Sequence, residues 1–231
     1  MRPILCLAML ISLVGTSFAS APTHGSVGRG QGVTLPDTQR DPCGTLLQGY
    51  DGTFENAYCW QYGGIVPPYY GAFAIEVPNY WIQLCGIRLM LTGTGGPCQP
   101  CDLYVWADDG GRPGDVLAVI AGANPCPVVT WPNVSAHDFS TNLPIMGTFW
   151  VGYWAGGFSN SPCGYYVGAD LNGGGNDNPM TNIAPGLGYP TGWNDVSVVW
   201  GPTQALGIAP WLFYDTPVNQ GSWGRIKHLY R

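Results

Sequence analysis

Charged side chains are scarce in this chain of 231 residues, where they make up only 10% of the sequence. Between Asp41 and Gly224 the only basic residues are Arg88 and Arg112. So few cations cannot form the basic surface that neutralises phosphates, and we therefore expect no nucleic-acid partner. Basic residues gather only at the end of the chain, where we interpret residues 217–231 as a solvated basic tail.

Long hydrophobic runs are absent beyond the first residues of the chain. Residues 1–19 have the features of a secretory signal peptide: a positive Arg2, an apolar run from Ile4 to Val14, and a small residue, Ala19, at the expected cleavage point. That run is too short to cross a bilayer and no later run is longer, so we expect no membrane span. We expect a protein that is secreted or held at the cell surface, and loss of Arg2 takes its formal net charge from −6 to −7.

The sequence also lacks a recognisable catalytic motif. Its only glutamates are Glu55 and Glu76, and no spacing pairs either of them with an aspartate as glycoside hydrolysis requires. The serines show no nucleophile-elbow pattern, and the candidates for a general base are His137 and, near the tail, His228. We therefore expect a protein that is not an enzyme.

Glycine and proline are abundant, at 35 and 21 residues, and no amphipathic helix or internal repeat is visible. Because hydrophobic residues make up 45% of the chain, burial can offset the entropy of ordering it, and the glycines and prolines are then turns between short strands. This pattern predicts an all-β fold: a single antiparallel β-sandwich with long Gly/Pro-rich loops in residues 42–216, after a flexible arm in residues 20–41. The predicted strands are 57–62, 69–77, 81–91, 103–107, 116–120, 128–131, 137–141, 148–155, 165–169, 196–200 and 206–214.

The clearest local signal is the segment from Asp102 to Leu117. A strand-favouring run is followed by Asp108-Asp109-Gly110-Gly111, which supplies side-chain acceptors and positive φ, and then by Pro113-Gly114, which adds a second bend. The segment predicts two strands joined by a sharp reversal.

The Asp-Asp-Gly-Gly-Arg-Pro-Gly turn at 108–114, the Trp131-Pro132 segment and the aromatic run 147–153 resemble the corresponding parts of uncharacterised β-sandwich modules found in exported bacterial proteins. The resemblance covers about residues 70–155, and Pro190–Trp193 and Ala205–Ile208 resemble the closing part of such a module. It implies a jelly-roll-like sandwich and carries no catalytic residue to this chain.

Aromatic residues are the main candidates for ligand contact. Trp150, Gly152 and Trp154 fall on one face of a strand, which leaves two indoles on either side of a glycine gap, and Tyr104 and Trp106 show the same alternation. If these faces are exposed, the rings suit stacking on sugars; if they are buried, they belong to the core, which is the commoner fate of aromatics in sandwiches.

Seven of the eight cysteines follow the signal peptide and are disulfide candidates in an exported chain. An odd number leaves one of them without an intramolecular partner, and the connectivity stays open. Cys98-Gln-Pro-Cys101 has redox spacing but runs into a strand instead of opening a helix, so we interpret it as a structural staple in a loop. A zinc site of Cys98, Cys101, Cys126 and His137 lacks a second close ligand pair. The seven candidates are Cys43, Cys59, Cys85, Cys98, Cys101, Cys126 and Cys163.

The segment 170–178 is rich in hard oxygen ligands at alternating positions. Asp170, Asn172 and Asp177 could hold a structural calcium ion, although the segment lacks the bidentate glutamate of an EF-hand loop. A polar glycine-rich turn is the simpler interpretation, and we expect no other cofactor.

Together these observations predict a secreted, non-enzymatic binding or structural module. Its expected partner is a neutral glycan or a surface protein, because an acidic chain rich in aromatics can stack on a ligand without needing charge. Two alternatives remain: an extracellular polysaccharide hydrolase or lyase, and a self-assembling surface protein.

Overall fold

The computed structural model describes most of the expected domain. The predicted signal peptide (1–19), the predicted basic tail (217–231), Cys43 and Cys163 lie outside the described residues. The described residues are 23–27, 33–34, 44–61, 69–155, 164–173, 175 and 177–214.

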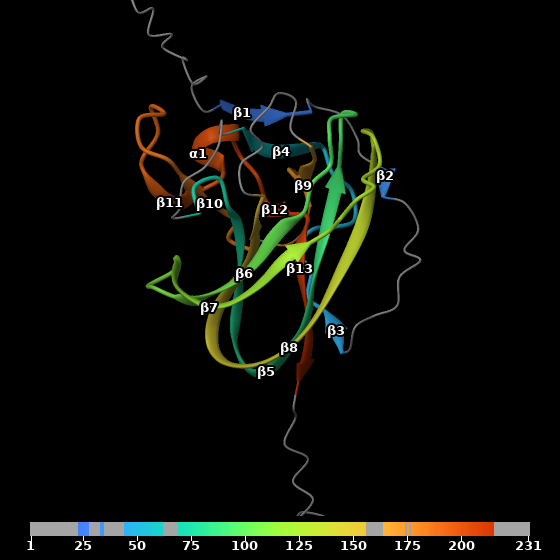
Figure 1. The fold of residues 1–231 in the computed structure, drawn as a ribbon. Helices are drawn as coiled ribbons and strands as arrows, with labels where there is room; N and C mark the ends of the chain where they lie inside the picture. The colour runs from blue at the N-terminus through green and yellow to red at the C-terminus, as the bar shows by residue number, and fades with distance from the viewer. Residues whose placement is uncertain are drawn as a thin grey trace, which may run out of the picture.

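The fold is all-β, and its strands pair almost entirely antiparallel, which confirms the predicted class (Figure 1). The main path of hydrogen-bonded strands runs β1-β4-β9-β5-β8-β6-β7. The elements are β1 (Thr23–Ser26), β2 (Val33–Thr34), β3 (Thr45–Leu46), β4 (Asn56–Gln61), β5 (Phe73–Thr92), β6 (Cys101–Asp108), β7 (Pro113–Ala123), β8 (Asn133–Trp154), β9 (Tyr166–Asp170), β10 (Met180–Ile183), β11 (Gly192–Asp195), α1 (Ser197–Trp200), β12 (Ala205–Leu206) and β13 (Ile208–Tyr214).

Two long strands, β5 and β8, organise the molecule. They pair antiparallel over nearly their whole length, with register shifts between Val77 and Tyr80 and between Leu84 and Gly86. Both strands curve through the lower end of the molecule in Figure 1, so each contributes to two layers. The first half of β5 pairs with the second half of β8, which in turn pairs with β6, whereas the second half of β5 pairs with β13. Bulges of this kind bend strands and sharpen their twist.

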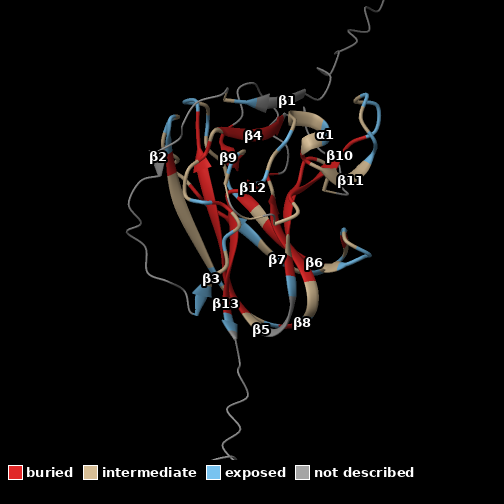
Figure 2. Cartoon of the chain, turned by 180° about the vertical axis from the view of Figure 1, so that it is seen from behind, coloured by how far each residue is buried: buried red, intermediate tan, exposed pale blue. Residues whose placement is uncertain are grey.

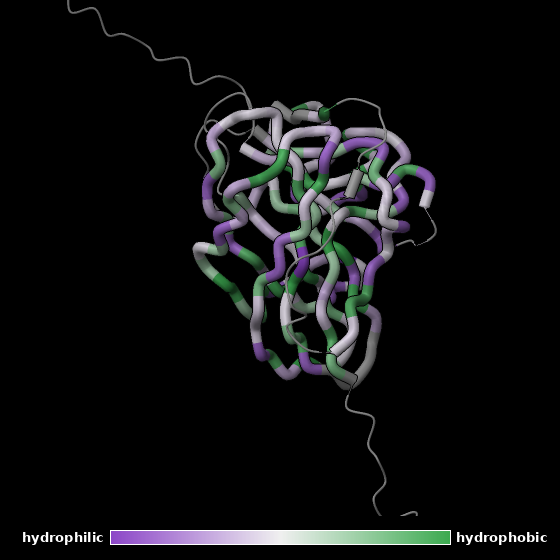
Figure 3. Tube along the Cα trace, turned by 90° about the vertical axis from the view of Figure 1, so that its right-hand side faces the viewer, coloured by the Kyte–Doolittle hydropathy of each residue, from purple (hydrophilic) through white to green (hydrophobic). Residues whose placement is uncertain are grey.

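The main core lies between the two halves of this bent ribbon. Phe73 and Ile75 from the first half of β5 belong to the same buried cluster as Ile87 and Leu89 from the second half. Figure 2 shows buried residues along much of the length of the strands in the body of the molecule. In Figure 3 hydrophobic and hydrophilic residues alternate in short patches, as expected for strands with one covered face. Within the described part of the chain, no helix is long and apolar enough to cross a membrane.

The turn after β6 is confirmed. β6 and β7 pair antiparallel, and Gly110 and Gly111 have φ of +62° and +86°. The Asp108 carboxylate accepts a hydrogen bond from the Gly111 backbone N–H at 3.1 Å. Asp108, Gly110 and Gly111 therefore have the roles that the sequence predicted for them. The second bend predicted at Pro113-Gly114 was wrong, because these residues begin β7 and Gly114 has no positive φ.

Several predicted elements were wrong. The paired predictions 69–77 and 81–91, and 137–141 and 148–155, are each one long strand, since β-bulges let a strand continue past a break in its alternation. Residues 196–200 form a short helical turn, in which the Asp195 carboxylate accepts the Ser197 N–H at 2.7 Å.

Two further segments differ from expectation. Residues 128–131 do not form a strand. The Gly93 N–H donates to the Val129 carbonyl, and the Trp131 N–H donates to the Gly93 carbonyl. The segment lies between two prolines, which have no N–H to donate to a neighbouring strand. The predicted flexible arm is partly ordered, because Thr23–Ser26 pairs antiparallel with β4 and Val33–Thr34 pairs parallel with β8. Both pairings are with distant strands, and local composition does not reveal them.

Candidate functional site

Strands β6 and β8 bring the four predicted aromatic residues onto one face of the sheet. In their register Trp106 lies opposite Trp150, and Tyr104 lies opposite Gly152. Directly opposed residues of an antiparallel pair point to the same side, so the predicted alternation places all four rings together. Gly152 is required there, because a Cβ at this position would overlap the Phe73 carbonyl oxygen.

Three of these four rings are buried. Trp150 is 0% exposed, Trp106 1% and Tyr104 5%, whereas Trp154 is half-buried. Of the predicted ligand contacts, only Trp154 is therefore not fully buried. The other three rings form a buried layer behind Trp154, as expected if they belong to the core.

Two aromatic residues that the sequence did not single out cover this layer. Tyr69 packs on Tyr104 with ring centroids 4.7 Å apart and meets Trp154 edge-on at 6.0 Å. Trp193 of β11 meets Trp106 edge-on at 5.2 Å. Tyr69 and Trp193 are both half-buried and come from segments far from β6 and β8 in the sequence, so no local pattern could have grouped them.

The backbone of Tyr69 is in an unusual conformation, with a φ of +50°. A bulky residue with positive φ is uncommon and costs free energy, so the surrounding structure must hold it. The next residues supply that hold: the Gly71 N–H donates to the Asn182 carbonyl at 2.7 Å, and the Ala72 N–H donates to the Tyr69 carbonyl at 3.0 Å.

Hydrogen bonds anchor the indoles at the edge of the layer. The Trp150 Nε1–H donates to Asp108 Oδ1 at 2.9 Å, and the Trp154 Nε1–H donates to the Tyr70 carbonyl at 3.1 Å. Burial, with a further contribution from the charge of Asp102, raises the pKa of Tyr104 to about 12. The Tyr104 phenol is therefore neutral at pH 7. Among the described residues, none of those on this face is a lysine or an arginine.

An apolar rim continues this face onto β7. Val119 lies opposite Tyr104 in the β6–β7 register, and Leu117 is two residues away on the same side of the strand. These side chains are 46% and 51% exposed. We call Tyr69, Trp154, Leu117 and Val119 the aromatic rim; their side chains are uncharged, and the Asp102 carboxylate lies opposite Trp154 at its edge.

Asp170 takes a structural role. One of its oxygens accepts the backbone N–H groups of Asn172 at 3.1 Å and Gly173 at 2.6 Å, and the other accepts the Asp51 N–H at 2.8 Å. Asn172 is exposed. Across the described ranges no group of three or more His, Cys, Asp or Glu side chains is arranged to hold a metal ion. Calcium binding by Asp170, Asn172 and Asp177 stays a prediction.

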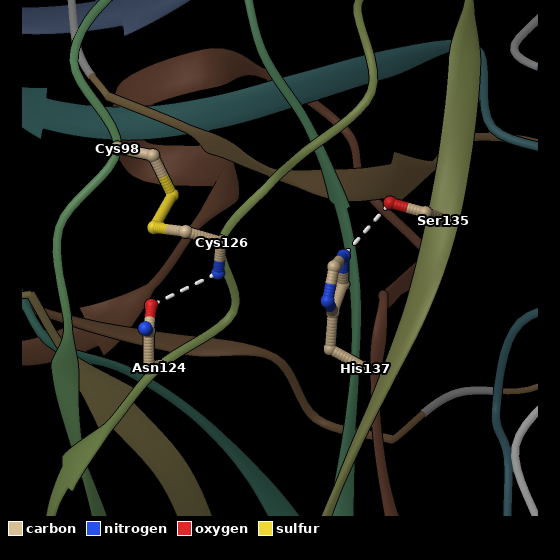
Figure 4. The surroundings of a disulfide bond; sticks show 5 residues. All are labelled: Cys98, Asn124, Cys126, Ser135 and His137. Carbon is tan, nitrogen blue, oxygen red and sulfur yellow. Dashed lines mark hydrogen bonds between the residues drawn. A yellow bond between two sulfur atoms is a disulfide. The ribbon is translucent and has the colours of Figure 1, made fainter.

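Ser135 and His137 form a hydrogen-bonded pair on β8, with Ser135 Oγ 2.7 Å from His137 Nε2, in the surroundings of a disulfide (Figure 4). Burial lowers the pKa of His137, so the ring is neutral at pH 7. A serine nucleophile also needs an orienting group on the histidine and free donors for an oxyanion. The neighbouring Asp138 is bound to Arg88, and β8 is paired with β5 at these positions. Within the described residues, Asp138 is therefore committed to Arg88 and is not an orienting group for His137.

The cysteines separate into bonded and free. Cys98 is bonded to Cys126 with 5.8 Å between their Cα atoms, and Cys59 and Cys85 are disulfide-bonded as well. Cys101 is a free, buried thiol, so its prediction as a disulfide cysteine was wrong. Cys98 therefore staples the loop to Cys126 and not to its close neighbour, and neither bonded sulfur can serve as a thiolate ligand for zinc.

We expect Cys101 to react with iodoacetamide only after unfolding. Burial raises the pKa of its thiol to about 11, with a smaller opposing effect from a hydrogen bond to Tyr165, so little thiolate forms near neutral pH. Alkylation without reduction, followed by peptide mass spectrometry, should label Cys101 in denaturant and leave it unlabelled in buffer. Labelling of the native protein, or a disulfide at Cys101, would contradict this arrangement.

Comparisons with protein-family models, with curated proteins and with solved structures found no match for this chain.

Proposed function

We propose that this chain is an exported, non-enzymatic binding module of jelly-roll-like type that holds a neutral, ring-shaped ligand, such as a glycan, on the aromatic rim. The observation that carries the proposal is the half-buried Trp154 and Tyr69 beside the exposed Leu117 and Val119. Sugar rings present apolar C–H faces that pack on aromatic side chains, and a preformed rim of this kind needs little reorganisation.

Charge supports a neutral ligand. The chain is acidic overall, and one of its two central basic residues, Arg88, is buried in an ion pair with Asp138. A polyanion such as a nucleic acid would find no cationic surface among the described residues. The disulfide between Cys98 and Cys126 is consistent with an exported protein, and we propose that the protein is secreted or attached to the cell surface.

The proposal is tested on an array of neutral glycans, with calorimetry on the best ligand. We expect Trp154→Ala to weaken binding about tenfold or more, because it removes the half-buried indole of the rim. Phe213→Ala is the matched control: Phe213 is 48% exposed but lies on β13, which pairs with the other half of β5, and we expect unchanged affinity.

Other outcomes would favour the alternatives. Equal weakening by both variants, or no binding of any neutral glycan, would contradict the rim as the ligand site. Turnover of a polysaccharide by the purified protein would favour a hydrolase or lyase, and concentration-dependent assembly would favour a self-associating surface protein.

A further inference from the structure

A separate cavity lies at the edge of β5 opposite β8. It has a volume of about 230 Å³ and is formed where the segment after β3 and the segment before β10 meet the first half of β5. Its walls combine acidic, amide and apolar side chains. The lining residues are Leu47, Gln48, Gly49, Ile75, Glu76, Pro78, Gly175 and Asp177.

The Asp177 carboxylate is the unusual feature of this cavity. Both of its oxygens are buried, and neither accepts a hydrogen bond from a described residue. Burying a carboxylate without a partner is costly, and native proteins rarely leave one so. Asp170 shows the contrast, since its buried oxygens receive three backbone N–H groups.

No cation of the described chain neutralises this carboxylate. Arg88 is bound to Asp138, and Arg112 is exposed in the turn between β6 and β7. Burial raises the pKa of Asp177 well above its usual value; backbone N–H groups of Asp177 and Leu206 near the carboxylate offset part of that rise, and the charge of Asp170 adds a smaller increase. The group therefore lacks the partner that would stabilise its charged form.

Two glycines fix the carboxylate in place. A Cβ on Gly49 would lie 2.8 Å from the Asp177 Cβ and 2.9 Å from its Oδ2, so the side chain of Asp177 lies directly against the bare backbone of Gly49. Gly175 packs against Gly49 so closely that any side chain there would overlap the Gly49 carbonyl. Packing against Gly49 thus helps to set the position of the carboxylate.

A second carboxylate stands at the same cavity. The Glu76 N–H donates to the Asp177 carbonyl at 3.0 Å, and Glu76 Oε2 accepts a hydrogen bond from Asn178 Nδ2 at 3.0 Å. Gln48 and Pro78 are exposed, so the cavity opens to solvent on their side. The Asp177 oxygens themselves are buried, so a ligand in this cavity contacts them only after a shift of the Asp177 side chain.

The walls decide which cation fits. A metal ion bound without its water shell would need several oxygen ligands close together, and the described residues offer no cluster of three acidic side chains. The cavity is several times the roughly 30 Å³ that one water occupies, and Leu47, Ile75 and Pro78 give it apolar walls. An apolar stem ending in a compact donor of three N–H groups matches such a space.

We propose that this cavity binds a primary alkylammonium group, with Asp177 as its counter-ion and Glu76 as a second acceptor. The alkyl stem would lie along Leu47, Ile75 and Pro78. A free amine and the side chain of a lysine in a partner protein share this chemistry.

The test is calorimetric titration and thermal denaturation of the full chain with pentylammonium and with Nα-acetyl-lysine methylamide. We expect both probes to bind and to raise the melting temperature. Asp177→Asn should weaken binding about tenfold or more, because it removes a desolvated charge partner. Asp115→Asn, at an exposed carboxylate on β7, is the matched control and should leave binding unchanged.

Glu76→Gln and Gly49→Ala keep the proposal testable if Asp177→Asn does not fold. The first weakens the second acceptor and the second displaces the Asp177 side chain, so both should reduce pentylammonium affinity. Binding of only the lysine amide would assign the site to a protein partner, and binding of pentylammonium alone to a free amine. Failure of both probes, equal binding by tetramethylammonium, which has no N–H, or tighter binding of Ca²⁺ would overturn the proposal.

Discussion

Asp138→Ala should lower the free energy of unfolding by about 3–5 kcal/mol, because it removes the carboxylate that pairs with a buried guanidinium. Arg88 on β5 donates from Nε to Asp138 Oδ1 at 2.8 Å and from Nη2 to Asp138 Oδ2 at 2.6 Å. The two side chains are only 10% and 5% exposed. Water therefore cannot replace the lost carboxylate without opening the sheet.

Asp138→Ala also removes the acceptor of a hydrogen bond from a third strand, β13. The Trp211 Nε1–H of β13 donates to Asp138 Oδ1 at 2.7 Å, and the Arg88 guanidinium lies 5.0 Å from the centre of the Trp211 ring. Asp138 thus ties β8 to both β5 and β13. Its loss leaves two buried donor groups unsatisfied, which adds to the cost.

Urea unfolding followed by tryptophan fluorescence measures the effect. Asp115→Ala, at an exposed aspartate, should change stability by less than about 0.5 kcal/mol. The double variant Arg88→Met with Asp138→Leu should recover part of the loss, because an apolar pair of similar volume carries no buried charge. A loss below about 1 kcal/mol for Asp138→Ala would show that the pair is effectively solvated.

Trp150→Ala should also be strongly destabilising, by about 3–5 kcal/mol, because it empties the centre of the aromatic layer. Trp150 is fully buried against β6, and its Nε1–H donates to Asp108, the residue that also accepts the Gly111 N–H in the turn. The substitution therefore creates a cavity and removes one of the contacts that hold the reversal between β6 and β7.

Trp154→Ala provides the comparison on the same strand. Since Trp154 is half-buried, its loss should cost clearly less than the loss of Trp150, and the domain should remain folded for the glycan measurement. Trp150→Phe should fall between the two, because it keeps much of the ring volume but not the hydrogen bond. Equal melting temperatures for the Trp150→Ala and Trp154→Ala variants would contradict the burial difference on which the rim is defined.

The candidate site was partly predictable from the sequence. Alternation along 147–155 and 102–107 correctly grouped Trp150, Trp154, Tyr104 and Trp106, because the side-chain period of a strand is a local property. It could not show which rings are covered. Coverage depends on Tyr69, which lies in a turn and has a positive φ, and on Trp193, which lies on β11.

The sequence also could not predict which cysteines and acidic residues find partners in the fold. Composition identified both as candidates, yet the free thiol is Cys101, and the carboxylate without a partner is Asp177 while its neighbour Asp170 is satisfied. The difference between the aspartates arises from contacts such as that of Asp51 with Asp170, 119 residues apart, and the disulfide joins Cys98 to Cys126, 28 residues away. A local pattern carries no information about such pairings.

The sequence by itself determined the all-β class, the reversal at 108–114 and the face on which the aromatic residues lie, since each depends on dihedral preferences and on a two-residue period. The tertiary structure alone decided that β5 and β8 run unbroken through a bend, that part of the N-terminal arm pairs with the sheet, and that Arg88, Asp138 and Trp211 meet. Strand order and register depend on the burial of the whole sheet, which neighbouring residues in the sequence do not encode.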